Sequence, residues 1–141
     1  MTMAKDNGCS ENCDVLVVDD DRDMLELLLA HMTKKGVRTR LLTIGNDLVG
    51  EIARSRPRLV LLDVMLPGFN GYQLCSSLKN DPVIANTPIY FITPLPPDDV
   101  IWHVTQCGAS GFIPKPFILA DIDKVLAAHG IGTGATVEIA G

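Results

Sequence analysis

Two apolar patterns alternate along this chain: short continuous runs of apolar residues, and apolar residues repeated at helical spacing. Residues 59–62 are all apolar, as is typical of a strand that is buried on both faces of a sheet. Another stretch repeats apolar residues at intervals of three and four: Leu25, Leu28, Leu29 and Met32. That spacing predicts a helix with one apolar face. We therefore expect strands and helices to alternate along the chain.

The whole pattern predicts five strand–helix pairs. The strands are expected at residues 14–19, 37–43, 59–62, 89–92 and 109–114. Helix starts are indicated by the acidic residues within 20–23 and by possible caps at Asn46 and Asp98. Two further helices are expected at residues 72–79 and around the apolar residues Leu119, Ile122 and Leu126. Strands that are apolar throughout favour a parallel sheet, and right-handed crossovers place helices on both of its faces. The expected class is therefore α/β, a three-layer sandwich.

The fourth predicted helix follows a rigid, proline-rich loop at residues 94–97. Its inward-facing residues are expected to be Ile101, Val104 and Gly108. Trp102 would then lie at the edge of the apolar stripe. We favour a partly buried packing role for it over a role in an interface.

Length and composition suit one domain with a buried core, because the chain has 141 residues and is 47% hydrophobic. We expect the domain at residues 14–129, with a flexible leader at 1–13 and a flexible Gly-rich tail at 130–141. Neither end is long enough for a DNA-binding or enzymatic output domain. If the chain is whole, its expected output is contact with another protein.

The charge balance narrows the choice of partners. The chain has 12 basic and 17 acidic residues, a formal net charge of −5, and no basic run. This argues against nucleic acid as a direct partner. No apolar stretch is long enough to span a membrane, and the first 13 residues lack a signal-peptide core, so we expect a cytoplasmic protein. The four cysteines and three histidines are scattered, which favours reduced thiols over a zinc site.

Polar side chains follow four of the predicted strands at the point where each ends. They are Asp19 and Asp20, Asp63, Thr93 and Lys115. The carboxyl ends of parallel strands meet at one edge of a sheet, where ligands bind in this class of fold. Crowded carboxylates favour a divalent cation, and oxygen ligands suit Mg²⁺, with Mn²⁺ as an alternative. An ammonium and a hydroxyl beside such an ion suit a phosphoryl group.

Each of these residues also has a plain structural interpretation. An acidic run after a strand is often only a helix cap, and a lysine before proline is usually solvated. It is much less probable that four strand ends all carry a carboxylate, hydroxyl or ammonium suited to a phosphoryl site by chance. The combination, rather than any single residue, favours the phosphoryl site.

The motifs around these residues resemble the receiver domain of two-component response regulators over nearly the whole predicted domain. Val-Val-Asp19-Asp20 resembles the acidic pair of that family, and the segment from Asp63 to Gly71 resembles its phosphoacceptor loop. Phe-Ile-Thr93 resembles the strand with the switch hydroxyl, and residues 108–117 resemble the final signature. The resemblance implies a flavodoxin-like (βα)5 fold with strand order 2-1-3-4-5.

The resemblance also implies a role for each site residue. Asp63 would be the phosphoacceptor, and Asp20 and Asp63 would bind Mg²⁺ directly. Asp19 would act through water, and the backbone carbonyl of Met65 would be a further ligand. Lys115 would pair with the phosphoryl oxygens.

Two further residues would respond to the phosphoryl group. The Thr93 hydroxyl would move to bond it, and the ring of Phe112 would turn inward. For Phe112, a plain core aromatic is an equally good interpretation. The Lys115–Pro116 peptide would be cis, as in the family.

The expected function is signalling by a response regulator rather than metabolic catalysis: the domain would catalyse only its own phosphorylation and dephosphorylation. The phosphoryl group would come from a sensor histidine kinase or a phosphotransfer protein. The output would be a downstream protein or a homodimer, formed through the helix at residues 98–107, the last strand and the last helix.

One departure from the family favours a different interpretation. The residue after the switch threonine usually offers an N–H to the phosphoryl group, but here it is Pro94, which has none. The domain could therefore be a pseudo-receiver, an interaction module with weak or no phosphorylation. A haloacid-dehalogenase-type phosphatase is disfavoured because Met65 stands where a second aspartate is needed. A flavodoxin is disfavoured because acids after the first strand repel phosphate.

Overall fold

The computed structural model describes residues 12–43 and 47–132. Expectations for residues 1–11, Asn46 and residues 133–141 lie outside the described part, as does Cys9. Within that part, no helix combines the length and the apolar character needed to cross a membrane.

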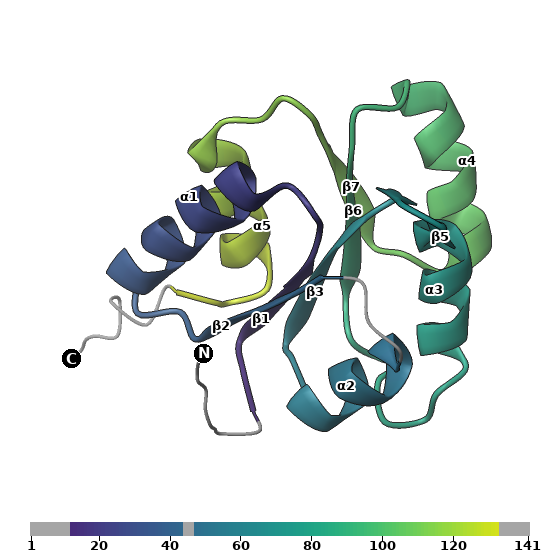
Figure 1. The fold of residues 1–141 in the computed structure, drawn as a ribbon, viewed down its shortest axis with the longest axis horizontal. Coiled ribbons are helices and arrows are strands. Elements are labelled where there is room, and N and C mark those ends of the chain that lie inside the picture. The colour runs from purple at the N-terminus through teal and green to yellow at the C-terminus, as the bar shows by residue number, and fades with distance from the viewer. Residues whose placement is uncertain (1–11, 44–46, 133–141) are drawn as a thin grey trace.

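Five parallel strands form one sheet, flanked by helices (Figure 1). They are β1 (Val15–Val18), β2 (Thr39–Leu42), β3 (Leu59–Asp63), β6 (Ile89–Thr93) and β7 (Gly111–Pro114). Their order is β2-β1-β3-β6-β7, which confirms the predicted parallel sheet and its strand order. The register pairs Val18 with Leu62 and Asp63 with Ile92, so the strand ends that carry polar groups lie at one edge.

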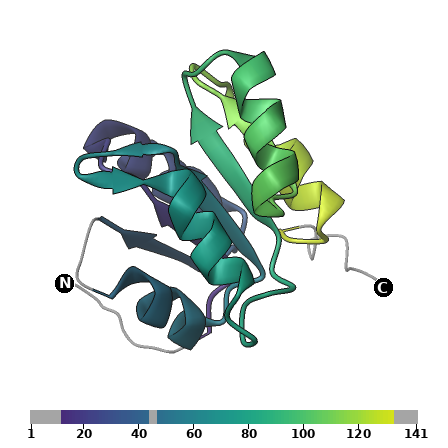
Figure 2. The same cartoon turned by 90° about the vertical axis from the view of Figure 1, so that its right-hand side faces the viewer.

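In the described part of the chain, four helices connect successive strands of the sheet and a fifth follows β7. They are α1 (Arg22–Lys34), α2 (Leu48–Ser55), α3 (Gly71–Lys79), α4 (Pro97–Cys107) and α5 (Leu119–Ala128). α1 and α5 cover one face of the sheet, and α2, α3 and α4 cover the other (Figure 1). Figure 2 shows α3 and α4 side by side on the second face.

The strand β3 shows why its sequence is apolar throughout. Leu59 and Leu61 pack beneath α1 and α5, whereas Val60 and Leu62 pack on the opposite face. All four side chains are fully buried. Because alternate residues of a strand point to opposite faces, a sheet with helices on both sides needs apolar residues at every position.

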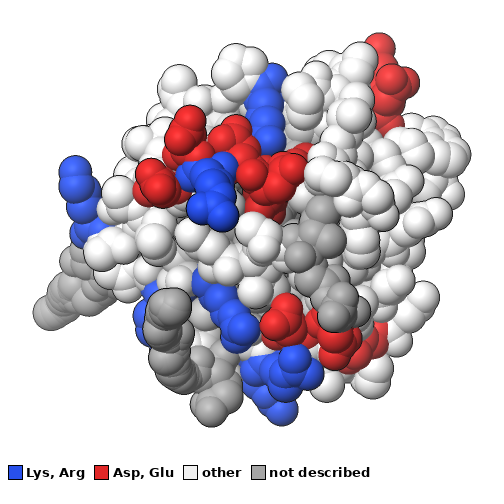
Figure 3. Space-filling view, viewed as in Figure 1, with Lys and Arg blue, Asp and Glu red and all other residues white. Residues whose placement is uncertain are grey.

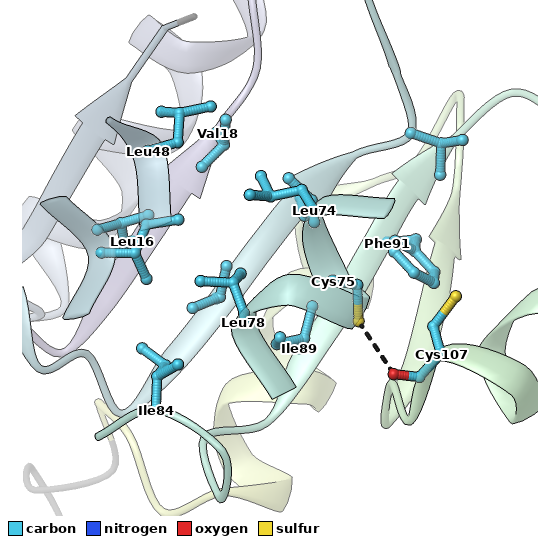
Figure 4. Close-up of a cluster of buried hydrophobic side chains, with 14 of the residues drawn as sticks. Leu16, Val18, Leu48, Leu74, Cys75, Leu78, Ile84, Ile89, Phe91 and Cys107 are labelled. Carbon is cyan, nitrogen blue, oxygen red and sulfur yellow. Dashed lines mark hydrogen bonds between the residues drawn. The ribbon is translucent and has the colours of Figure 1, made fainter. Parts of the chain in front are cut away.

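The core under α2, α3 and α4 is the larger of two apolar clusters (Figure 4). Phe91 is one of its largest side chains and is fully buried. Cys75 is buried as well, and its thiol points to the backbone carbonyl of Cys107, 3.6 Å away. Cys13, Cys75 and Cys107 are buried and form no disulfide with one another.

The expectation for the fourth helix was wrong in its start and in two of its three inward-facing residues. α4 begins at Pro97, not at a cap on Asp98, since proline's fixed φ suits the first helical position. Val100 and Cys107 are buried, and Val104 packs against the same cluster as expected. Ile101 is 53% exposed, and Gly108 is exposed as well. Val100, Ile101 and Trp102 are consecutive apolar residues, so the pattern alone permitted either phase.

Other expectations need smaller corrections. Trp102 is 60% exposed rather than partly buried, and Leu29 on α1 is exposed rather than inward-facing. Within the Asp63–Gly71 segment, residues 65–70 form a short antiparallel hairpin. Its strands are β4 (Met65–Leu66) and β5 (Phe69–Asn70).

Candidate functional site

Asp19 lies directly after β1 and is fully buried. One of its carboxylate oxygens accepts a hydrogen bond from the backbone N–H of Asp21, at 3.0 Å. The other accepts one from the Lys115 ammonium, at 3.1 Å. These contacts join the start of α1 to the loop after β7 and satisfy a charge that would otherwise be costly to bury.

Asp63 ends β3 and is also buried. Its Oδ1 accepts a hydrogen bond from the backbone N–H of Met65, at 3.1 Å, and its Oδ2 lies 3.8 Å from the Lys115 ammonium. Burial, with a smaller contribution from the neighbouring Asp19, raises the pKa of the Asp63 carboxyl to about 6, despite the opposing effects of the Met65 N–H and the Lys115 ammonium. This carboxylate is therefore only partly neutralised by its surroundings.

Three carboxylates meet at this edge of the sheet. One oxygen from each of Asp19, Asp20 and Asp63 lies within 4.8 Å of the other two, and Asp20 is exposed to solvent. An all-oxygen donor set with one open side fits a hard divalent cation such as Mg²⁺, which keeps part of its water shell. Figure 3 shows acidic side chains gathered with basic ones on the face that Figure 1 presents.

Thr93 ends β6 next to this cluster, and its side chain is fully buried. Its hydroxyl oxygen accepts a hydrogen bond from the backbone N–H of Leu95, at 3.1 Å, while its carbonyl accepts one from Lys115 N–H, at 2.8 Å. Pro94 between them offers no N–H. The nearest backbone donor after Thr93 is thus already bonded to the threonine itself.

Lys115 reaches the carboxylates from the end of β7 and is 20% exposed. The peptide bond between Lys115 and Pro116 is cis. Phe112 on β7 pairs with Phe91 on the neighbouring strand β6. Its side chain is half-buried against the apolar cluster beneath α3 and α4. The structure therefore brings Asp19, Asp20, Asp63, Thr93 and Lys115 together and leaves Phe112 farther back in the sheet.

A hollow of about 550 Å³ opens beside the carboxylates. Its lining residues are Asp20, Val64, Met65, Leu66, Pro67, Phe69, Asn70, Tyr72 and Leu95. Neither Tyr72 nor Leu95 was expected at the site from the sequence. No sequence signal could place them there, because their position depends on how the hairpin and α4 pack.

Gly71 explains how the hairpin can sit so close to Asp63. A Cβ at this position would collide with the backbone carbonyl of Asp63 and with Cα of Val64. The Gly71 N–H also donates to the Val64 carbonyl, at 2.9 Å. Only glycine permits this approach, so the residue that closes the Asp63–Gly71 motif fixes the backbone under the carboxylate.

Comparison with known proteins assigns this arrangement to a family. The model of the response regulator receiver domain matches residues 15–127. The chain belongs to the response regulator receiver family. Its five-stranded parallel sheet is the flavodoxin-like fold of that family.

Two curated relatives and one solved structure illustrate the match. The chain is 35% identical over 102 residues to the response regulator PleD of Caulobacter vibrioides, covering 72% of this chain and 22% of that protein. It is 34% identical over 116 residues to the uncharacterized transcriptional regulatory protein YvcP of Bacillus subtilis, covering 79% and 48%. This receiver therefore spans less than half of these relatives.

A putative response regulator from Chloroflexus aurantiacus has the same fold, with a TM-score of 0.75 and 26% sequence identity. The match covers 84% of this chain and 98% of that one. The likeness extends over the sheet and its helices rather than over a local motif.

Proposed function

We propose that this receiver accepts a phosphoryl group on Asp63 from a phosphohistidine of a kinase or phosphotransfer protein. The observation that carries the proposal is the position of the Asp63 carboxylate, buried between Asp19 and the Lys115 ammonium at the carboxyl edge of the sheet. In the transfer, an Asp63 oxygen forms the new P–O bond as the P–N bond of the donor breaks. The released imidazole keeps the bonding electrons and takes up a proton.

The other site residues support this step. Asp20 and Asp63 would hold Mg²⁺ directly, Asp19 would act through water, and the Met65 carbonyl would complete the protein ligands. When bound, the ion supplies positive charge for the phosphoryl oxygens. Lys115, already in contact with both buried carboxylates, would move its ammonium onto those oxygens.

Thr93 would couple the presence of the phosphoryl group to a change in the surrounding structure. Its hydroxyl proton is available to donate, while its oxygen accepts from Leu95 N–H. When the Thr93 side chain turns toward the phosphoryl group, its hydrogen bond with the Leu95 N–H breaks, and Leu95 is released. The ring of Phe112 would then move inward.

The test is modification with acetyl phosphate and Mg²⁺, followed by mass spectrometry. We expect one phosphoryl group on the wild-type chain and none on Asp63→Asn. Glu26→Gln, which removes an exposed carboxylate on α1, is the control and should be modified like the wild type. A wild-type chain that stays unmodified, and that also fails to bind beryllofluoride with Mg²⁺, would contradict the proposal.

Pro94 supports a second candidate, a pseudo-receiver that works without phosphate. A hydrogen bond to a charged acceptor is worth about 1.5–3 kcal/mol, and Pro94 removes one such donor. Under the main proposal, Pro94→Ala should lengthen the lifetime of phospho-Asp63 and tighten beryllofluoride binding. If neither quantity changes, the missing donor has no bearing on the site.

The proposed output is a protein contact in the cytoplasm rather than an enzymatic product. α4, β7 and α5 form the surface that we propose for a downstream protein or a second copy of the chain. Ile101, Trp102 and Ile118, which are all more than half exposed, offer apolar contact area there. Light scattering with and without beryllofluoride distinguishes the homodimer from a monomer that needs another partner.

A further inference from the structure

The hydroxyl of Tyr72 on α3 is buried and has no hydrogen-bond partner among the described residues. The ring meets Phe91 edge to face, with centroids 5.0 Å apart. It stacks on the His103 ring of α4 at 3.8 Å, with the two planes only 10° apart. Such a hydroxyl destabilises the arrangement that buries it, so α4 covers a polar group that it does not satisfy.

The face of α4 that meets Tyr72 carries side chains that can bond to a hydroxyl. Asp99, His103 and Cys107 recur every four residues and so share one face of the helix. Burial raises the pKa of the Tyr72 hydroxyl, and the nearby Cys107 thiol and Asp99 carboxyl raise it further. The Asp99 carboxylate is an acceptor on the same face of α4 as His103, whose ring stacks on Tyr72.

The link between the phosphoacceptor site and α4 is short and stiff. Residues 94–97 carry three prolines, whose φ angles are fixed. The single residue between the prolines is Leu95. Its backbone N–H donates a hydrogen bond to the Thr93 hydroxyl, and the residue lines the same hollow as Tyr72. A displacement at Thr93 therefore passes to the start of α4 instead of being absorbed by the loop.

We propose that Tyr72 is a positioning residue whose hydroxyl gains a partner when α4 shifts, and thereby favours the phosphorylated arrangement over the resting one. This rests on the proposed phosphorylation of Asp63. When the Thr93 hydroxyl turns to the phosphoryl group, Leu95 and the proline link move, and α4 slides over the Tyr72 ring. The unsatisfied hydroxyl lowers the cost of that movement.

Trp102 makes the movement measurable. It is the only tryptophan in the chain, and its ring meets His103 edge to face, with centroids 4.9 Å apart. A change in the stack between His103 and Tyr72 therefore alters the surroundings of the indole. Emission from Trp102 reports on α4, while calorimetry reports separately on ligand binding.

The experiment titrates the full chain with beryllofluoride and Mg²⁺, following both heat and Trp102 emission. For Tyr72→Phe we expect a higher melting temperature without ligand and about tenfold weaker beryllofluoride binding, because only the resting arrangement is relieved of an unsatisfied group. Tyr90→Phe is the matched control. It also removes a hydroxyl, but one that forms a 2.8 Å hydrogen bond with His129. It should lower the melting temperature and leave binding unchanged.

The outcomes separate the two proposals. If the wild type binds beryllofluoride but Tyr72→Phe binds equally well, or if Trp102 emission does not respond to binding, the role of Tyr72 is refuted and the phosphoacceptor proposal stands. If the wild type neither binds beryllofluoride nor is modified by acetyl phosphate, both proposals fall.

Discussion

Replacing Asp63 with asparagine should stabilise this domain in the absence of divalent cations. The pKa of the Asp63 carboxyl rises from an ordinary 3.8 to about 6 in the folded protein. Between these values the folded state binds more protons than the unfolded state, so stability falls as the pH rises through this interval. Above pH 6 the carboxylate is ionised in both states, and the full cost of holding it buried beside Asp19 remains.

The size of the effect follows from the pKa difference. Each pKa unit is worth about 1.4 kcal/mol, so the ionised Asp63 destabilises the fold by about 3 kcal/mol at pH 8 and about half of that at pH 5. Asparagine has the shape of the neutral acid and removes this cost. For a domain of this size the gain corresponds to a melting temperature about 10 °C higher at pH 8.

The assay is chemical and thermal unfolding of the wild type and Asp63→Asn between pH 5 and pH 8, with EDTA throughout. Glu26→Gln controls for the loss of one negative charge from an exposed position. The reasoning is refuted if Asp63→Asn is no more stable than the wild type at pH 8. It is also refuted if the gain does not shrink toward pH 5.

Three further predictions concern other parts of the fold. Gly71→Ala should lower the free energy of unfolding by about 1–3 kcal/mol and weaken beryllofluoride binding, because its Cβ displaces the Asp63 backbone; urea unfolding and calorimetry measure the two effects. Phe91→Ala should cost about 3–5 kcal/mol of unfolding free energy in urea, and a loss below 1 kcal/mol would contradict its full burial in the core. The hydrogen bond from His31 holds the pKa of Asp123 below its usual range, so Asp123→Asn should be less stable than the wild type near pH 6, and unfolding curves should converge as the pH falls below 3.8.

The sheet could be predicted from the sequence because its signal is local and repeated. A strand covered on both faces must be apolar at every position, and residues 59–62 satisfy that condition without help from any other element. Polar residues immediately after such strands then share one edge by topology alone. That argument brought together Asp63 and Lys115, which the structure places with Oδ2 and Nζ 3.8 Å apart.

The details of α4 could not be predicted, because they depend on packing rather than on pattern. Three consecutive apolar residues in its first turns allow two helical phases, and the choice between Val100 and Ile101 is made by the cluster beneath the helix. The stack of Tyr72 on His103 joins two helices through positions that carry no motif. The polar hydroxyl of Tyr72 favours an exposed position, so the residue type alone would predict exposure rather than the burial that is found.

The contact between Asp19 and Lys115 also bears on how the chain is made. The two residues are 96 positions apart, and the contact forms only when the last strand of the sheet has docked. A ribosome releases the acidic pair long before it releases the lysine that neutralises it. A nascent or truncated chain that ends before β7 therefore carries Asp63, the proposed phosphoacceptor, without its counter-charge. Under that proposal, only the finished domain is competent for phosphorylation, and incomplete chains are poor substrates for a phosphoryl donor.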